Sequence, residues 1–515
     1  MPRWFNVAGP CNAADHYMLP VMRRLPKIQR LIDRKSYFVL HAPRQVGKTT
    51  ALLALGRELT AKGAYVAVLL SVEVGAAFPL DTDAAELAIL DAWRRDAHAR
   101  LPADLQPPPW PDAPPGARIG AALAAWSIAA PRPLVIFIDE IDALSGPPLV
   151  SLLRQLRGGY PNRPREFPWS LALIGLRDVR DYKLDPEHEG AHGGSPFNIK
   201  DTSLTLRNFT QDEVRELYAQ HTADTGQPFT EAAVARAFHL SAGHPWLVNA
   251  LAREAVDDLL EDRGHPVTDL IIDAAKELLI RRQDTHLDNL AERLREPRVR
   301  RIIEPILAGE ALPLVPDDDL RYVQDLGLVR PEDSGGLVIA NPIYREVIPR
   351  ALASVAIASL PRIQPTWLSD TGDLDESRLL AAFLAFWRQH GEPLLGAAPY
   401  HEIAPHLVLM AFLHRVVNGG GTIEREYAIG SGRMDLLVRY RGRALALELK
   451  VWRDHEPDPL TEGLAQLDRY LAGLGLDHGW LVLFDRRSAL PRLAERTSAA
   501  DTTTPAGRRV TVIRA

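Results

Sequence analysis

The stretch Ala42-Pro-Arg-Gln-Val-Gly-Lys-Thr49 decides the fold of the first part of the chain. It follows the apolar run 36–41 and precedes a helix-prone run, which is the strand–loop–helix context of a phosphate-binding loop. In that context backbone N–H groups wrap the phosphates, a lysine reaches the terminal ones and a hydroxyl binds Mg²⁺. The pattern G-x-x-x-x-G-K-[ST] is met at Gly47, Lys48 and Thr49, with Ala42 in place of its first glycine. We therefore predict a nucleotide-binding loop, against the alternative of an ordinary strand–helix turn.

A second apolar run, residues 134–138, ends in Asp139 and Glu140. A continuous apolar run suits a parallel strand that is buried on both faces. There Asp139 would hold the metal with Thr49, and Glu140 would polarise the attacking water. A strand that merely ends in a solvated acid is the alternative, but the position downstream of the phosphate loop favours the functional interpretation. The predicted nucleotide contacts are Ala42, Pro43, Arg44, Gln45, Val46, Gly47, Lys48, Thr49, Thr50 and Asp139.

The composition indicates a folded protein of several domains. A chain of 515 residues is too long for a single hydrophobic core, and its 46% hydrophobic and 24% charged content is ordinary for a globular protein. The net charge of −6 argues against a uniformly basic coat, so any contact with nucleic acid must be local. No apolar run has the length of a membrane span, and the single cysteine, Cys11, fits a reducing compartment. We expect a cytoplasmic protein without membrane contact.

Residues 1–205 alternate between predicted strands and helices, which is typical of a parallel α/β sheet. The predicted strands are residues 36–41, 64–71, 134–139 and 169–175. The proline-rich residues 102–118 indicate an extended surface insertion. After the last strand, Arg177 and Arg180 are candidates for sensing the γ-phosphate, although an exposed arginine after a strand is common.

Helices are predicted to dominate the middle of the chain. The capping box Thr210-Gln-Asp-Glu213 would open a helical lid spanning residues 206–290. Residues 291–350 have the pattern of a winged helix, a fold that reads DNA in many proteins. Its expected third helix, residues 317–326, carries four aspartates and one arginine, which favours a packing role over a DNA contact. A helical connector is expected at residues 351–399.

A second set of candidate residues lies in a domain predicted at residues 400–515. Two apolar runs flank Arg441-Gly442, which is a hairpin signature. If these two residues form the loop, Asp435 lies directly opposite Glu448, with Cβ atoms about 4.5–5.5 Å apart. Period-two alternation places Glu448 and Lys450 on one face and the neighbouring leucines on the other. The sequence therefore predicts that two carboxylates and a lysine converge.

Two carboxylates at this spacing need a hard cation between them, and Mg²⁺ with its waters is the candidate for Asp435 and Glu448. Lys450 could orient a water and help to deprotonate it. In the following predicted helix, Gln466 and Tyr470 are four residues apart and share the face toward this site. A cross-strand salt bridge on a solvated sheet face is the alternative, and the helix favours the catalytic interpretation.

The residues Asp435, Glu448-Leu-Lys450 and Gln466-x-x-x-Tyr470 resemble the PD-(D/E)XK nuclease superfamily, in particular members with a trailing Q-x-x-x-Y motif. With the phosphate loop and Asp139-Glu140, nearly the whole chain resembles prokaryotic AAA-like ATPases that carry such a domain. The resemblance implies an α/β multidomain fold with a P-loop parallel-sheet ATPase core, a helical lid, a winged helix and a C-terminal α/β nuclease-like domain.

The same resemblance implies ATP and Mg²⁺ as cofactors and metal-dependent phosphodiester cleavage. Asp435 and Glu448 would bind the metal, Lys450 would act at the nucleophile, and Gln466 and Tyr470 would support it. The superfamily's helical acid would be Glu402. Met434 stands where the superfamily's name has a proline, which is a common departure.

Three hypotheses follow for the function. The first is an ATP-gated nuclease acting on nucleic acid, DNA rather than RNA, with a role in defence against foreign DNA by analogy alone. The second is a nucleotide-switched DNA-binding or regulatory protein whose nuclease fold does not cleave. The third is an ATP-driven motor that uses its C-terminal domain as a clamp. The sequence leaves homo-oligomer formation open.

Overall fold

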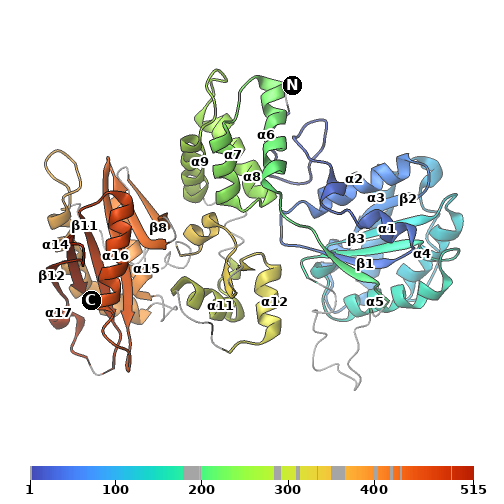
Figure 1. Cartoon of the computed structure of the whole chain (residues 1–515). Coiled ribbons are helices and arrows are strands. Elements are labelled where there is room, and N and C mark those ends of the chain that lie inside the picture. The colour runs from blue at the N-terminus through green and yellow to red at the C-terminus, as the bar shows by residue number, and fades with distance from the viewer. Residues whose placement is uncertain are drawn as a thin grey trace. The chain divides into compact units, whose positions relative to one another are not determined.

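The chain divides into two compact units in the computed structural model (Figure 1). The first unit comprises Met1–His286 and Pro316–Pro342, and the second comprises Leu287–Val315 and Ile343–Ala515. The structure describes residues 3–177, 197, 199–282, 292–308, 312, 314–332, 335–349, 366–397, 404–417, 421–429, 432–488 and 490–515. None of the helices in these ranges is both long enough and apolar enough to cross a membrane.

The first unit is built on a five-stranded parallel sheet of order β2-β3-β4-β1-β5. Its strands are β1 (Tyr37–His41), β2 (Val66–Ser71), β3 (Leu134–Asp139), β4 (Ser170–Gly175) and β5 (Thr202–Thr205). The first four were predicted because each is a continuous apolar run with buried residues on both faces. The fifth strand is short and polar, and it lies at the edge of the sheet beside β1. Its sequence therefore carried no apolar signal.

Helices cover both faces of this sheet (Figure 1). One face carries α3 (Thr82–Arg100), α4 (Arg118–Ala129) and α5 (Gly146–Gly159), and the other carries α1 (Ile28–Asp33) and α2 (Lys48–Ala61). Short 3₁₀ turns occur at η1 (Val21–Arg23), η2 (Glu73–Ala77), η3 (Ala103–Leu105), η4 (Ile141–Ala143) and η5 (Tyr160–Asn162). The core on each face is formed by alternate residues of the same strands, as a two-sided sheet requires.

The proline-rich residues 102–118 lie at the surface, as predicted, and residues 107–114 have no regular structure, but Leu105 and Trp110 attach them to this core. Leu105 is buried, and Trp110 donates its indole N–H to the carbonyl of Leu90 at 3.0 Å. The Trp110 ring also lies 6.0 Å from that of Trp126 in α4. The prolines keep the segment out of regular structure, while its apolar side chains attach it to the helices.

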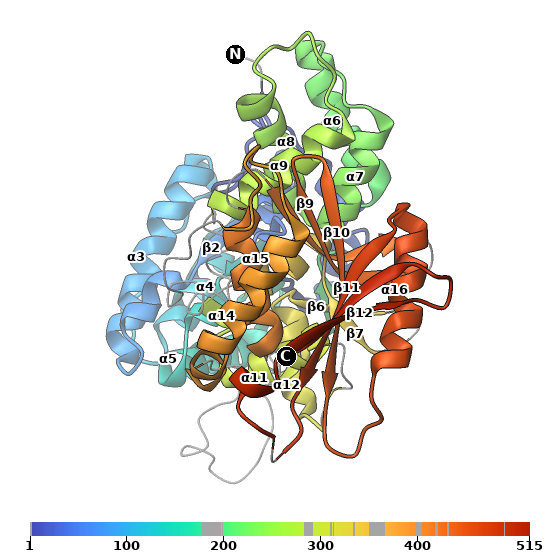
Figure 2. The ribbon, with the colours of Figure 1, turned by 90° about the vertical axis from the view of Figure 1, so that its left-hand side faces the viewer.

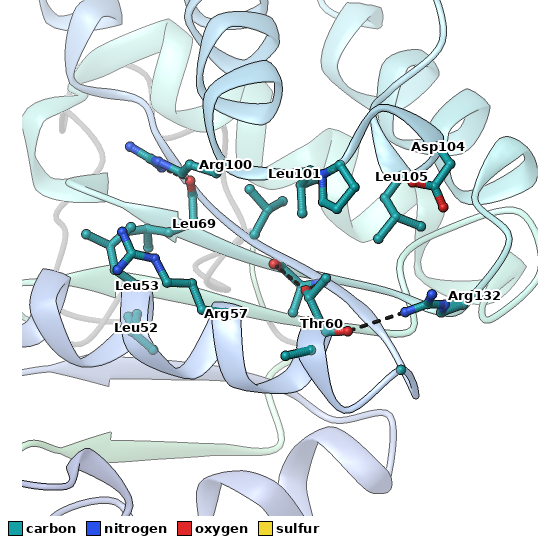
Figure 3. A pocket seen from close by; sticks show the side chains of 16 residues that line it. Leu52, Leu53, Arg57, Thr60, Leu69, Arg100, Leu101, Asp104, Leu105 and Arg132 are labelled. Carbon is teal, nitrogen blue, oxygen red and sulfur yellow. Dashed lines mark hydrogen bonds between the residues drawn. The ribbon is translucent and has the colours of Figure 1, made fainter. Parts of the chain in front are cut away.

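Side chains close the outer edge of β2 (Figure 3). The Thr60 hydroxyl donates to the carbonyl of Ala67 and accepts from its N–H, at 3.1 and 3.0 Å. Arg100 donates to the carbonyl of Leu69, and Arg132 donates to the carbonyl of Thr60 at 3.3 Å. An edge strand with free main-chain groups is a template for pairing with another chain. The arginines lie around a hollow of about 500 Å³. We interpret them as groups that keep another strand from pairing with β2.

A group of helices follows the sheet within the first unit. They are α6 (Gln211–Thr225), α7 (Glu231–Ser241), α8 (Pro245–Arg253), the π-helical turn η8 (Glu254–Leu259) and α9 (Asp269–Arg282). The predicted capping box is confirmed, because Thr210 accepts from the N–H of Glu213 at 3.3 Å and the Glu213 carboxylate accepts from the N–H of Thr210 at 2.8 Å.

The predicted wing strands form an antiparallel pair that belongs to the first unit. This segment, Pro316–Pro342, contains α12 (Asp317–Asp325), β6 (Val329–Pro331) and β7 (Leu337–Ile339). The helix α11 (Pro297–Ala308) falls in the second unit, and residues 342–349 are helical. The winged-helix assignment of residues 291–350 remains a prediction.

The second unit is built on a six-stranded mixed sheet of order β12-β13-β11-β10-β9-β8. Its strands are β8 (Gly421–Ile429), β9 (Gly432–Tyr440), β10 (Arg443–Trp452), β11 (His478–Asp485), β12 (Ser498–Thr503) and β13 (Arg509–Arg514). The strands β10, β11 and β13 are parallel, whereas β8, β9 and β12 join as antiparallel neighbours.

Helices lie on both faces of the second sheet (Figure 2). One face carries α14 (Glu376–Ala397) and α15 (Ala404–Val417), and the other carries α16 (Leu460–Leu474). A short helix, α17 (Leu493–Arg496), precedes β12. Trp367 and Trp387 belong to the same buried core as the sheet. The core of this unit thus begins before residue 400, where the sequence placed its boundary.

Candidate functional site

The predicted phosphate loop lies between β1 and α2, in the strand–loop–helix context that the sequence indicated. Gly47 caps the N-terminus of α2 with a φ of +88°, a left-handed conformation that favours glycine. Gln45 also has a positive φ, of +58°. Ala42 does not, and its side chain is 1% exposed within the core. Alanine therefore fits the place of the motif's first glycine without backbone strain. The residues Arg44 and Gln45 are exposed at the outside of the loop.

Lys48 folds back over the loop that it follows. Its ammonium group donates to the carbonyls of Ala42 and Pro43 at 2.7 and 2.9 Å. Burial lowers the pKa of Lys48, and the carboxylates of Asp142, Asp139 and Glu140 oppose that shift. A bound phosphate would offer this cation a charged partner in place of the two carbonyls.

Thr49 and Asp139 are in direct contact at the start of α2. The Thr49 hydroxyl donates to Oδ2 of Asp139 at 2.8 Å, and Oδ1 of Asp139 accepts from the N–H of Glu140 at 3.0 Å. Asp139 is 4% exposed, and burial raises its pKa against the effect of these hydrogen bonds. A hydroxyl and a carboxylate are hard oxygen donors of the kind that Mg²⁺ takes together with nucleotide phosphates. The pair therefore fits the predicted metal.

Glu140 leaves β3 in a left-handed conformation, with a φ of +58°. Glu140 is exposed, and partial desolvation raises its pKa together with the charges of Asp139 and Asp142. A carboxylate with a raised pKa is a better proton acceptor. Asp142 in turn accepts from the N–H of Leu176 at 2.9 Å, which ties the end of β4 to this loop.

Three hydrogen bonds at or beside the predicted phosphate loop have no counterpart in the sequence motif. Arg24 donates to the carbonyl of Val46 at 3.0 Å and to that of Arg207 at 2.9 Å, and burial lowers the pKa of Arg24 to about 10. The hydroxyl of Thr50 accepts from the N–H of Cys11 at 3.0 Å, so in this structure it holds the N-terminal segment. Main-chain acceptors leave no pattern in a sequence, which is why Arg24 was missed.

The structure describes only one of the two arginines predicted as candidates for sensing the γ-phosphate. Arg177 lies two residues beyond the end of β4, with its guanidinium carbon 4.0 Å from the centroid of the Tyr322 ring. Arg180 lies outside the described residues.

The second set of residues is organised by the predicted hairpin. Arg443 pairs with Tyr440 and Leu447 pairs with Leu436, which is the register expected for a loop at Arg441-Gly442. These two loop residues have φ values of +47° and +82°. A two-residue hairpin turn with both central residues left-handed matches the twist of its strands. The same register places Asp435 opposite Glu448.

Glu448 is a buried carboxylate without a hydrogen bond from any described residue. It is 0% exposed, and neither of its oxygens accepts a hydrogen bond. Burial raises the pKa of Glu448 well above its usual range, and the nearby Asp435 charge adds to this. Lys450 Nζ lies 3.4 Å from Oε1, and its charge acts in the opposite direction. Asp435 is anchored through Oδ2, which accepts from the N–H of Leu449 at 2.7 Å.

Lys450 is oriented by the helix α16. Its ammonium group donates to Oε1 of Gln466 at 2.8 Å, and the Gln466 amide donates to the hydroxyl of Tyr470 at 2.9 Å. The exposed carboxylate of Glu462 lies 3.5 Å from the same ammonium group. The structure thus brings together all five residues that the sequence singled out here, with Gln466 and Tyr470 holding the lysine.

Asp435 and Glu448 offer a cation two hard donors. Among the described residues, no third acidic, histidine or cysteine side chain joins them. Glu402 and the side chain of Met434 lie outside the described residues. The ammonium of Lys450, 3.4 Å from Glu448, offsets part of the cost of burying this carboxylate, but Asp435 adds a second negative charge beside it. The pair therefore fits Mg²⁺ that keeps several waters.

No protein-family model and no curated protein matches the chain. Among solved structures, the chain is similar to the Walker-type ATPase PABY2304 of Pyrococcus abyssi, at 15% identity and a TM-score of 0.47 over 67% of this chain and 99% of that one. It is also similar to the RuvB Holliday junction branch migration motor of Thermotoga maritima, at 16% identity and a TM-score of 0.35 over 63% and 92% of the two chains. A third similar structure is that of Cdc6p from Pyrobaculum aerophilum, at 13% identity and a TM-score of 0.34 over 64% of this chain and 92% of that one. The geometry of the two sites carries the functional argument below.

Proposed function

We propose that the first unit binds and hydrolyses ATP. The observation that carries this proposal is the contact between Thr49 and Asp139, beside the half-buried Lys48 and at the N-terminus of α2. Backbone N–H groups of a helix N-terminus and a lysine form a site for phosphates, and the hydroxyl and carboxylate provide for Mg²⁺. The metal, when bound, neutralises charge on the phosphates.

Glu140 is the proposed base for the attacking water. It directly follows Asp139 of the proposed metal site, and its pKa is raised by partial desolvation and by two neighbouring carboxylates. Lys48 would leave the carbonyls of Ala42 and Pro43 and bind the terminal phosphates. These roles separate binding, which depends on Lys48, from hydrolysis, which depends on Glu140.

We propose further that the second unit cleaves nucleic acid with Mg²⁺. The supporting observation is that Glu448 is buried, lacks hydrogen bonds and lies beside Asp435 and Lys450. Asp435 and Glu448 would hold the metal, which supplies charge stabilisation and an acidified water. Lys450, held by Gln466 and Tyr470, would orient that water and the phosphate.

DNA is the proposed substrate, and the exposed arginines of the hairpin support a contact with its backbone. Arg439, Arg441 and Arg443 lie at the hairpin end, and Arg443 is five residues, or about 17 Å along β10, from Glu448. That distance corresponds to about five base pairs of duplex. A duplex that reaches the metal site can therefore also contact the hairpin.

Two matched substitutions test the two activities. Glu140→Gln should remove ATP hydrolysis and leave Mg²⁺-dependent cleavage of DNA, since Gln keeps the shape of the side chain but cannot accept the proton. Glu448→Gln should remove the cleavage of DNA and leave ATP hydrolysis unchanged. Phosphate release and plasmid nicking measured on both proteins would contradict the proposal if either substitution removed both activities or neither.

A further inference from the structure

The segment Pro316–Pro342 contacts the surroundings of the phosphate loop within the first unit. Tyr322 of α12 is 5% exposed, and the guanidinium of Arg177 lies over its ring at 4.0 Å. Asp325, the last residue of α12, has Oδ1 3.8 Å from Nδ1 of His41, the last residue of β1. The same helix therefore reaches the ends of two neighbouring strands.

A third contact touches the phosphate loop itself. Gly327 has a φ of +74° and lies against Pro43, so closely that a Cβ on Gly327 would be 2.7 Å from Cγ of Pro43. Real Cβ atoms essentially never approach another heavy atom to that distance. Gly327 therefore allows the segment to pack directly on the loop.

Arg177 is placed beside the loop by the sheet. The strands β1 and β4 are parallel neighbours, with His41 paired to Gly175, and the N–H of Ala42 donates to the carbonyl of Gly175 at 3.4 Å. Ligands of open parallel sheets bind at the carboxyl ends of the strands, and Arg177 lies two residues beyond the carboxyl end of β4. The negative face of an aromatic ring attracts a guanidinium group that lies over it, and this attraction favours one orientation of Arg177.

We propose that Tyr322 positions Arg177 to contact the terminal phosphate of ATP, and that Gly327 holds Pro43 in place by packing directly against it. The segment Pro316–Pro342 is then part of the nucleotide site. This inference rests on the ATPase proposed above. Because residue 343 begins the second unit, the segment also links the phosphate loop to that unit along the chain. If nucleotide binding displaces Pro43 or Arg177, the contacts of these residues with the segment Pro316–Pro342 change. By the same linkage, a displacement of the segment changes the affinity for the nucleotide.

Substitutions of Tyr322 separate positioning from packing. We expect Tyr322→Leu to lower kcat for ATP hydrolysis by about tenfold with less than a twofold change in the Kd for ADP, because ADP lacks the phosphate that Arg177 would contact. Tyr322→Phe keeps the ring and should restore the wild-type kcat. Arg177→Gln should match Tyr322→Leu, and the double variant should be no slower than either, since both changes remove one interaction.

Wild-type kcat in Tyr322→Leu, or additive losses in the double variant, would overturn the positioning role. A wild-type protein that does not hydrolyse ATP would instead overturn the ATPase proposal, so the two failures are distinguishable. Lowered kcat in both Tyr322→Leu and Tyr322→Phe would assign the effect to the hydroxyl and would also reject positioning by the ring.

Gly336 provides a matched control for Gly327. Its φ is +88°, and a Cβ there would meet nothing within 4 Å, so Gly336→Ala shares the backbone strain of Gly327→Ala without the collision with Pro43. We expect Gly327→Ala to weaken ADP binding at least fivefold and Gly336→Ala to change it less than twofold. Equal effects of the two substitutions would show that the contact with Pro43 does not bear on nucleotide binding.

Discussion

Glu448→Gln is expected to abolish the stabilisation of this protein by Mg²⁺ and to make the metal-free protein more stable. The wild-type carboxylate is buried, accepts no hydrogen bond from a described residue and lies beside Asp435. An ionised carboxylate in such a place costs several kcal/mol, and a cation offsets that cost. The glutamine has the same shape without the charge, so it removes both the cost and the affinity for the metal.

The size of the metal effect follows from mass action. At a Mg²⁺ concentration of a hundred times its Kd, binding to the folded state adds about 2.7 kcal/mol. In a unit of this size one kcal/mol moves the Tm by about 2–4 °C, so Mg²⁺ should raise the Tm of the second unit by about 5–10 °C. Glu448→Gln should show no such shift.

The dependence on pH has a definite sign. The pKa of Glu448 is raised in the folded state, so its contribution to stability is complete below the ordinary glutamate pKa and is lost as the pH rises toward the folded value. Glutamine does not titrate. The Tm advantage of Glu448→Gln over the metal-free wild type should therefore grow from about pH 5 up to the folded pKa of Glu448, which is raised to about 9.

Thermal unfolding in Mg²⁺ and in EDTA, without nucleotide, measures these shifts. Glu462→Gln is the matched control, because Glu462 also lies near Lys450 but is 76% exposed and forms no part of the proposed metal pair. It should keep the wild-type response to Mg²⁺. An equal response in wild type and Glu448→Gln, or loss of the response in Glu462→Gln, would refute this reasoning.

Further predictions concern each site separately. Lys48→Ala should lose ATP binding in a calorimetric titration, because no other described side chain takes the place of its ammonium beside Ala42 and Pro43; binding within threefold of wild type would contradict this. Gln466→Leu removes the acceptor of Lys450 and the donor to Tyr470, and it should slow DNA cleavage about tenfold while keeping the Tm shift with Mg²⁺. Lys450→Ala should slow cleavage further and also keep the metal, and loss of the Mg²⁺ shift would show that Lys450 helps to build the metal site.

The sequence predicted the geometry of both candidate sites because the signals for it are local. The register of the hairpin follows from Arg441-Gly442, since a two-residue turn and strict alternation together decide which side chains face each other. The apolar runs of β1 to β4 identify a sheet buried on both faces. In both cases neighbours in the sequence carry the information.

What the sequence missed depends on contacts between distant segments. Nothing near Tyr322 or Gly327 in the chain indicates that they meet Arg177 and Pro43. Likewise, Trp110 gave no sign of packing on the core, because its partners Leu90 and Trp126 lie on two different helices. Only the folded chain brings such groups together.

The measurement that tests the central claim most directly is the nicking of supercoiled plasmid in Mg²⁺, with and without ATP. The two-site account predicts nicking by wild type that EDTA abolishes, that Glu448→Gln lacks, and that ATP changes several-fold in wild type but not in Lys48→Ala. Wild-type activity in Glu448→Gln, or no nicking by wild type in any nucleotide state, would contradict it.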